Sequence, residues 1–266
     1  MDGLTISFRG IDADKGHVEA FAGIESAAGI ARALTLIGHY AATGSVRHRF
    51  PFDETVQFYL EGTEQGSFNW KLTVTIAGSL ALGLATNGIY DLGKLAIGRA
   101  IGEEPTGISQ QVEAINKDRS GDIDALVEAI EPALKKAHYG IGETMNEIVI
   151  EETRTRRVLV KFDSASKRYL KDSVEADDDV QDVAISALNV NDRTGRAYFL
   201  DLKRTIPFRV SRDADSSTMT ILSAGINRYA NKLPAPIRLT FSRVEAVDGR
   251  LKRIIILKAE DVSDTE

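Results

Sequence analysis

The sequence predicts an α+β protein with an N-terminal sheet and packed helices, a helical connector, and a C-terminal small β-barrel or curved sheet with an inserted helix. Its 266 residues, 43% apolar and 27% charged, suit a soluble chain of about two domains. Strand and helix patterns alternate over the first hundred residues, whereas strand patterns dominate from residue 158 onward. Residues 101–150 carry 10 acidic and 4 basic residues, so most of the net charge of −6 lies in the middle. We therefore expect domains at 1–102, 103–153 (the acidic connector) and 154–262.

The first domain begins with a strand over residues 4–9, where β-branched and aromatic residues run up to Gly10. A helix of roughly 20 residues follows, because apolar residues recur every three or four positions from Phe21 to Ile37. Gly44 is its expected end. Further strands are expected within 45–61 and over 68–76.

A run of 19 residues without charge, 72–90, is the most unusual segment. Its glycines and hydroxyl side chains make it weakly hydrophobic for a membrane span. We expect it to divide into a strand end at 72–76 and a small-residue helix over 78–101 that is buried or faces a partner. The side chains expected to contact that partner are Leu80, Leu84, Ile89 and Leu92. Membrane insertion through 72–90 is the alternative.

The connector is expected to contain helices at 108–117 and 123–139, after the break at Pro105. Residues 116–127, NKDRSGDIDALV, follow much of a calcium-loop pattern. The twelfth position must supply a bidentate carboxylate, and Val127 stands there. The pattern therefore favours helix capping over calcium binding.

The rear domain contains strand patterns at 158–162, 183–190, 197–202 and 205–210, a helix pattern at 214–231, and a hairpin around Asp248-Gly249. Basic and aromatic residues interleave there, as they do in proteins that bind single-stranded nucleic acid. The candidate nucleic-acid contacts are Arg196, Lys203, Arg204 and Arg209. The alternative places Tyr198, Phe199 and Phe208 in the core and the charges in water.

One local group of side chains could bind a metal. Asp12, Asp14 and His17 follow the first strand, and two carboxylates with an imidazole can hold a divalent cation. The alternative is that both aspartates stabilise the turn and the helix start. The sequence contains no phosphate-binding loop, dinucleotide fingerprint, HExxH or GxSxG motif, so we name no catalytic residue. It also contains no cysteine, which excludes disulfides and thiol chemistry.

The opening, LTISFRGIDADKGH…FAGIESAAGIARAL, followed by LEGTEQGSFNWKL, resembles a bacterial family of uncharacterised two-domain proteins. Its members have a Gly-Gly-Asp-Ala-Asp-Asn-His-like turn after the first strand and a Glu-Gly-Ser-Trp-like turn later. The matching positions are Gly10, Asp12, Ala13, Asp14, Glu64, Gly66 and Ser67. The rear TGRAYFLDLKRTIPFRV resembles the family's β-rich C-terminal region. The resemblance implies an intracellular bacterial or mobile-element protein, and it implies no activity.

Together these observations favour a non-enzymatic binding or assembly module of a bacterial or mobile-element system, with antiviral defence as a further hypothesis. We expect no cofactor, a second copy or another protein as partner, and a cytoplasmic location, since no secretory signal opens the chain. The alternatives are a nucleic-acid-binding protein using the rear domain, a metal-dependent enzyme using Asp12, Asp14 and His17, and a membrane-interacting protein.

Overall fold

The computed structural model describes residues 3–63, 68–171, 173–202, 204–231, 236–247 and 249–262. The chain divides into two compact units, a first unit of residues 1–115 and 126–171 and a second unit of residues 116–125 and 172–266. The expected connector, 103–153, is therefore not a unit of its own. The boundary expected at 153/154 lies instead after residue 171.

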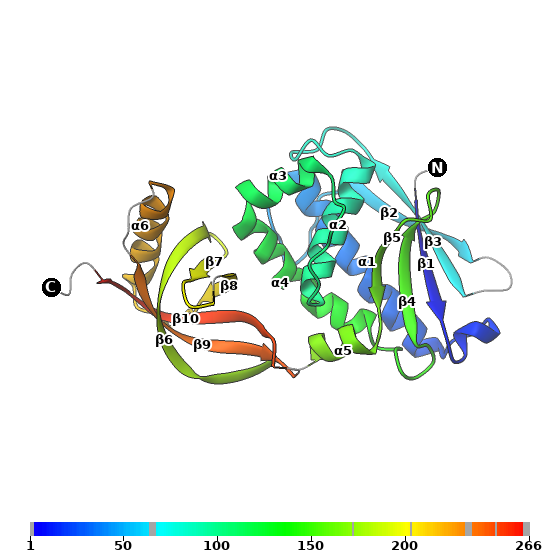
Figure 1. Ribbon diagram of the computed structural model, residues 1–266. Helices are drawn as coiled ribbons and strands as arrows, with labels where there is room; N and C mark the ends of the chain where they lie inside the picture. The colour runs from blue at the N-terminus through cyan, green and yellow to red at the C-terminus, as the bar shows by residue number, and fades with distance from the viewer. Residues whose placement is uncertain are drawn as a thin grey trace. The chain divides into compact units, whose positions relative to one another are not determined.

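The first unit is built on a five-stranded sheet with the order β2-β3-β1-β4-β5 (Figure 1). All neighbouring strands are antiparallel. The strands are β1 (Gly3–Arg9), β2 (Val56–Thr63), β3 (Asn69–Ile76), β4 (Glu147–Glu152) and β5 (Val158–Phe162). In the central strand β1, Leu4, Ile6 and Phe8 are all buried, as alternate residues on one face of a strand should be. Strand β4 was expected to be part of the connector, and it instead pairs with β1.

Helices accompany this sheet: α1 (Ala20–Thr43), α2 (Thr86–Ala100), α3 (Gln110–Asp118), α4 (Ser120–Ala137), α5 (Ser164–Lys171) and the short η1 (Ala13–Lys15). Helix α1 packs against α2 and β2. It ends at Gly44, whose φ of 67° is left-handed, as predicted. Gly29 lets α1 approach the backbone of α4, since a Cβ there would lie 2.3 Å from the Ala137 nitrogen.

The uncharged run does not form the predicted helix over 78–101. Residues 72–76 end β3, residues 77–85 are neither helix nor strand, and α2 begins at Thr86. Leu84, Ile89 and Leu92 are buried inside the first unit and Leu80 is half-buried, so the predicted partner face is mostly core. A spanning helix over 72–90 is not formed either. Within the described residues, α1 alone is long and apolar enough to cross a membrane, and 56% of its apolar window is buried.

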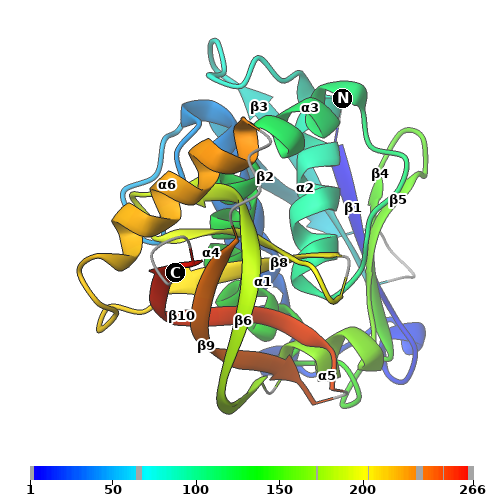
Figure 2. The same ribbon diagram turned by 60° about the vertical axis from the view of Figure 1, so that its left-hand side comes forward.

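The second unit is a closed barrel with the strand order β10-β8-β7-β6-β9 and one helix, which confirms the predicted architecture (Figure 2). Its elements are β6 (Ser173–Asn189), β7 (Thr194–Phe199), β8 (Arg204–Val210), α6 (Thr218–Ala230), β9 (Ile237–Ala246) and β10 (Leu251–Asp261). Strands β10 and β8 are parallel and the other neighbours are antiparallel. Helix α6 packs on β6 and β10. The interior is filled by aliphatic side chains and by Phe199, Phe208 and Phe241.

Two local predictions have clear outcomes. The hairpin around Asp248-Gly249 is present as β9 and β10, with Gly249 at a φ of 79°, although Asp248 itself lies outside the described residues. The calcium-loop pattern at 116–127 lies in α3 and α4. Because those residues are helical, the twelve-residue loop that calcium requires is not formed.

Candidate functional site

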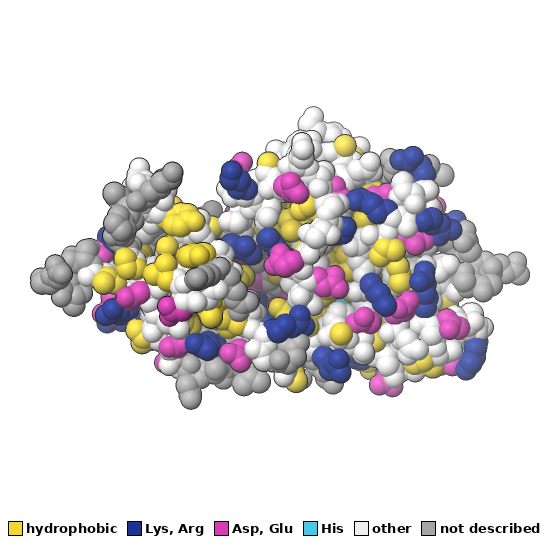
Figure 3. All heavy atoms as spheres, viewed as in Figure 1, with side chains coloured by type: hydrophobic (Ala, Val, Ile, Leu, Met, Phe, Trp, Pro, Cys, Tyr) yellow, Lys and Arg dark blue, Asp and Glu magenta, His cyan; other side chains and the backbone are white. Residues whose placement is uncertain are grey.

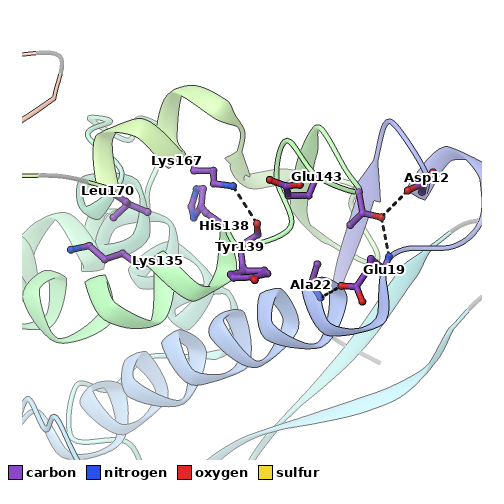
Figure 4. Close-up of a pocket in the computed structure, with 10 residues that line it drawn as sticks. Asp12, Glu19, Ala22, Lys135, His138, Tyr139, Glu143, Lys167 and Leu170 are labelled. Carbon is purple, nitrogen blue, oxygen red and sulfur yellow. Dashed lines mark hydrogen bonds between the residues drawn. The ribbon is translucent and has the colours of Figure 1, made fainter.

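A hollow of about 670 Å³ in the first unit, here called the polar pocket, brings several polar side chains together (Figure 4). Five segments line it: the turn after β1, the start of α1, the end of α4, the loop after α4, and α5. The lining residues are Asp12, Glu19, Ala22, Lys135, His138, Tyr139, Glu143, Thr144, Lys167 and Leu170. Its size lies within the range typical of small-molecule sites.

Opposite charges lie at opposite ends of this pocket. Figure 4 shows the carboxylates of Asp12 and Glu19 toward one end and the ammonium group of Lys135 toward the other, with Glu143 and Lys167 in the middle. Tyr139 and Ala22 also lie between the two ends. A ligand that lies along the pocket therefore meets a negative field at one end and a positive field at the other.

The acidic end is held together through the buried hydroxyl of Thr144. This hydroxyl accepts a hydrogen bond from the Glu19 backbone N–H at 2.9 Å and donates one to Asp12 Oδ2 at 3.3 Å. The Glu19 carboxylate in turn accepts hydrogen bonds from the N–H groups of Phe21 and Ala22 at 3.1 and 2.7 Å. These helix-capping bonds lower the pKa of Glu19. The hydrogen bond from Lys15 is the main cause that lowers the pKa of Asp12.

Glu143 differs from the other two carboxylates. Its side chain is exposed at the pocket, and no hydrogen bond or ion pair joins it to another described residue. A carboxylate that has no hydrogen-bond or ion-pair partner suits the binding of an amine. Glu143 is therefore the group best placed to contact a cationic part of a ligand.

Backbone and side-chain acceptors fix the two lysine side chains of the pocket. Lys167 Nζ donates to the carbonyl oxygens of Tyr139, at 3.2 Å, and of Ile141. Lys135 Nζ lies 3.3 Å from Oε1 of the buried Glu131. The two ammonium groups are thus held at defined positions, which reduces the entropy that a bound anion would have to remove.

His138 forms the buried wall of the pocket. Its Nδ1 lies 2.8 Å from the Leu134 carbonyl oxygen, so Nδ1 carries the hydrogen and Nε2 accepts from the Ser166 hydroxyl, also at 2.8 Å. Burial lowers the pKa of His138 to about 4, which keeps the ring neutral at pH 7. Ser166 also accepts from the Asp163 N–H, while Asp163 Oδ1 accepts from the Ser166 N–H, as in a capping box. This histidine–serine pair therefore supports the start of α5.

The turn that carries Asp12 is strained. Ile11 has a φ of 51°, an outlier for a β-branched residue, and its side chain is exposed. The preceding Gly10 packs so closely on Asn146 that a Cβ would lie 2.5 Å from Nδ2. This path brings the Asp12 N–H within 3.1 Å of the Thr144 carbonyl oxygen. Such strain is concentrated at functional sites in proteins generally.

The three residues predicted to bind a metal are only partly brought together. Asp14 accepts from the Gly10 N–H at 2.7 Å, and His17 Nε2 lies 4.0 Å from Asp12 Oδ1. Asp12 lines the polar pocket, whereas Asp14 and His17 do not. Across the part of the chain that the structure describes, no three His, Asp or Glu side chains are arranged to hold a metal ion.

The predicted nucleic-acid residues have separate positions on the barrel. Arg196 Nε forms a 2.7 Å ion pair with Asp124 Oδ2 within the second unit, and Arg209 is exposed on β8. Lys203 lies outside the described residues, and the structure does not describe the side chain of Arg204. Phe199 and Phe208 are core residues, as the alternative interpretation expected.

Other basic side chains on the barrel also face acidic neighbours. The ion pairs are Arg238–Asp182 at 2.8 Å, Lys258–Glu260 at 2.7 Å, Arg228–Asp261 and Arg243–Asp179. Figure 3 accordingly shows basic and acidic side chains interspersed on the visible face. Such pairing weakens the positive field that dense phosphate binding requires.

These features define a protein with an α+β domain that bears a charged pocket and a separate closed β-barrel. Residues 4–171 match a model described as Domain of unknown function (DUF7946), and residues 180–260 match one described as Family of unknown function (DUF7947). The chain belongs to the DUF7946 family, whose match ends where the first unit ends. Searches of curated proteins and of solved structures each found no match. The expected uncharacterised two-domain family is thereby supported, and bacterial origin stays a prediction.

Proposed function

We propose that this chain is a non-enzymatic binding module whose first unit holds a zwitterionic small molecule in the polar pocket. The observation that carries the proposal is the separation of Asp12 and Glu19 at one end of the hollow from Lys135 at the other. A zwitterion matches both ends at once, whereas a dication or a dianion would meet a like charge at one end. Like charges across a binding site cost affinity, so the pocket should discriminate among the three kinds of ligand.

The positions of individual residues support this orientation of the ligand. The ammonium group would lie by Glu143, whose carboxylate has no other described partner. The anionic group would lie by Lys135, and Tyr139 would cover the chain between them. Among the groups of the pocket that could perform acid–base chemistry, His138 is bonded to Ser166 and through it to the cap of α5. Binding without chemistry therefore fits the site best.

Calorimetric titration with matched ligands tests the proposal. The probes are ω-amino acids, α,ω-diamines and α,ω-diacids, each with four-, five- and six-carbon chains. We expect an ω-amino acid to bind more tightly than the diamine and diacid of equal length. Glu143→Gln should weaken that binding about tenfold or more, because it removes a charge-assisted hydrogen bond. Glu113→Gln, which changes an exposed carboxylate outside the pocket, is the matched control.

Two results would overturn this function. One is that no probe binds, and the other is that Glu143→Gln and Glu113→Gln bind the ω-amino acid equally well. Preference for the diamine would keep the pocket as a site but exclude a zwitterion as its ligand.

The other expected functions stay proposals, and the structure lends them less support. Self-association would need a surface other than Leu84, Ile89 and Leu92, which are buried; light scattering tests it. A metal-dependent enzyme would need a third ligand beside Asp12 and His17. Membrane insertion would need 72–90 to refold, and binding of nucleic acid through the barrel would need the ion pairs there to open. The cytoplasmic location and the defence role stay predictions.

A further inference from the structure

The loop between α1 and β2 carries a second feature that the polar pocket does not explain. We call residues 45–55 the arginine–phenylalanine loop. Arg47, His48, Arg49 and Phe50 are consecutive and all exposed. Phe50 is 75% exposed, more than any other large hydrophobic side chain in the described part of the chain. An exposed phenylalanine ring presents an apolar face on which a flat partner can stack.

The ring of Phe50 is nevertheless held in place by neighbouring side chains. Its ring lies 4.5 Å from that of Phe52, measured between centroids. The Arg32 guanidinium of α1 lies over both rings, 4.8 Å from Phe50 and 4.4 Å from Phe52. The same guanidinium donates through Nη2 to the His48 carbonyl oxygen at 2.8 Å. Arg32 thus fixes both the ring and the backbone of the loop.

The two ends of the loop are fixed to α1 as well. His39 Nδ1 accepts a hydrogen bond from the Asp53 N–H at 2.9 Å, and the Thr43 hydroxyl accepts one from the Ser45 N–H at 3.2 Å. A loop held at three places loses little conformational freedom when it binds a partner. The arrangement is therefore pre-organised for binding.

The two arginine side chains of the loop have no ion-pair partner among the described residues. No hydrogen bond or ion pair joins the side chain of Arg47 or Arg49 to another described residue. On the barrel, by contrast, Arg196, Arg238 and Arg243 each pair with an aspartate. The loop therefore offers guanidinium groups that can bind phosphate without first breaking an ion pair.

We propose that the arginine–phenylalanine loop binds single-stranded nucleic acid. One base stacks on the outer face of Phe50, and the guanidinium groups of Arg47 and Arg49 contact the adjoining phosphates. Aromatic platforms flanked by cations are the general means of holding single strands. A duplex fits less well because its bases are already stacked. An anionic membrane fits less well because Phe50 is the single exposed large hydrophobic side chain of the loop.

Fluorescence anisotropy with a labelled twelve-nucleotide oligothymidylate tests the proposal on the full chain. The wild-type protein should bind it more tightly than a duplex of equal length. Phe50→Ala should weaken binding about tenfold, and Phe50→Trp should retain it, because both base stacking and fold survive that change. The double variant Arg47→Ala, Arg49→Ala should weaken binding and reduce the salt dependence by about two phosphate contacts. Arg209→Ala on the barrel is the matched control and should bind like wild type.

Several results would overturn the proposal. They are the absence of oligonucleotide binding by the wild-type protein at low salt, equal affinity of Phe50→Ala and wild type, and a loss of binding in Arg209→Ala as large as in the double variant. Binding to phosphatidylserine vesicles without binding to the oligonucleotide would assign the loop to membranes. Because the loop variants leave Glu143 unchanged, they should not alter ω-amino acid binding, so this proposal and the pocket proposal fail separately.

Discussion

Both units contain ion pairs, but the arginines on the barrel strands and the arginines in the loop after α1 differ in their partners. In the barrel, basic groups lie beside acidic ones, as in Arg238–Asp182 and Arg196–Asp124. In the first unit, Glu143 and the arginines at 47 and 49 have no such partner among the described residues. The rear of the sequence, 151–266, nevertheless has the higher positive balance, with 21 basic and 19 acidic residues. The capacity of a region to bind a charged ligand depends more on side chains without an ion-pair partner than on the net charge of the region.

Geometry explains the difference. On antiparallel neighbouring strands of the barrel, an outward side chain has a cross-strand neighbour about 5 Å away, so a basic residue can lie opposite an acidic one. Arg238 and Asp182 are directly opposite on β9 and β6. A loop or a helix end has no obligatory neighbour of this kind. The charges of the polar pocket and of the arginine–phenylalanine loop can therefore remain open to a ligand.

The largest effect should come from removing a large side chain in the barrel core. Phe241 is fully buried, and its ring lies 5.6 Å from that of Phe199. Phe241→Ala should lower the free energy of unfolding of the second unit by about 3–5 kcal/mol. Urea denaturation followed by circular dichroism measures this loss. The ω-amino acid should still bind with the wild-type affinity, because the pocket has its own core; lost binding would show that the two units are not separate in function.

Acid should weaken the first unit through His138. The folded protein keeps this ring neutral down to a pKa of about 4, whereas the unfolded chain protonates it near 6.5. Between these values the unfolded state binds one more proton, so the free energy of unfolding falls as the pH falls from about 6.5 to 4. The shift corresponds to roughly 3 kcal/mol at most. Denaturation at a series of pH values measures it.

His138→Gln is the control for the acid effect. The variant will be less stable than wild type at pH 7, because a well-packed ring is lost beside Phe162. Its stability should vary less with pH between 6.5 and 4. An unchanged slope would assign the acid effect to other groups, such as His39, whose pKa burial also lowers.

A matched pair of glycine variants compares close and loose packing inside the first unit. At Gly29 a Cβ would meet the Ala133 carbonyl oxygen at 2.5 Å, so Gly29→Ala should cost about 1–3 kcal/mol. At Gly93, in the middle of α2, the nearest atom would be Ile37 Cδ1 at 4.0 Å. Gly93→Ala should therefore raise stability by about 1 kcal/mol, through its better helix propensity. Thermal denaturation measures the stability of both variants. If both were stabilised, or both destabilised, the packing described would be wrong.

The sequence predicts the barrel better than the sites, for a physical reason. Strand alternation and the Asp248-Gly249 pair are local signals, and they predict the hairpin that β9 and β10 form. The polar pocket takes residues from five segments, and only Asp12 among them stands in a recognisable pattern. No local pattern links Glu143 to Lys135 or Lys167. Their proximity depends on how α1, α4 and α5 pack, which periodicity does not specify.

The basic and aromatic residues show the same limit. Such residues interleave at 196–209 and also at 47–52, and the two stretches look alike in the sequence. What separates them is long-range pairing. Asp124 lies 72 positions from Arg196 and forms an ion pair with it, whereas Arg47 forms none with a described residue. The sequence alone therefore does not distinguish the loop from the barrel stretch, where Phe199 and Phe208 are core residues.

The smallest expected effect comes from removing an acidic partner of an arginine on the barrel. Asp182→Asn removes the hydrogen-bonded partner of Arg238 and leaves Glu260, opposite it on β10, as its remaining acidic neighbour. The stability loss should stay below about 1 kcal/mol, since exposed ion pairs contribute little. Oligonucleotide affinity at low salt should rise roughly twofold, because one more cation can contact phosphate. Asp201→Asn changes the net charge equally without freeing an arginine, so it should leave the affinity unchanged. An equal rise in both variants would mean that net charge, and not the release of a particular arginine, governs binding.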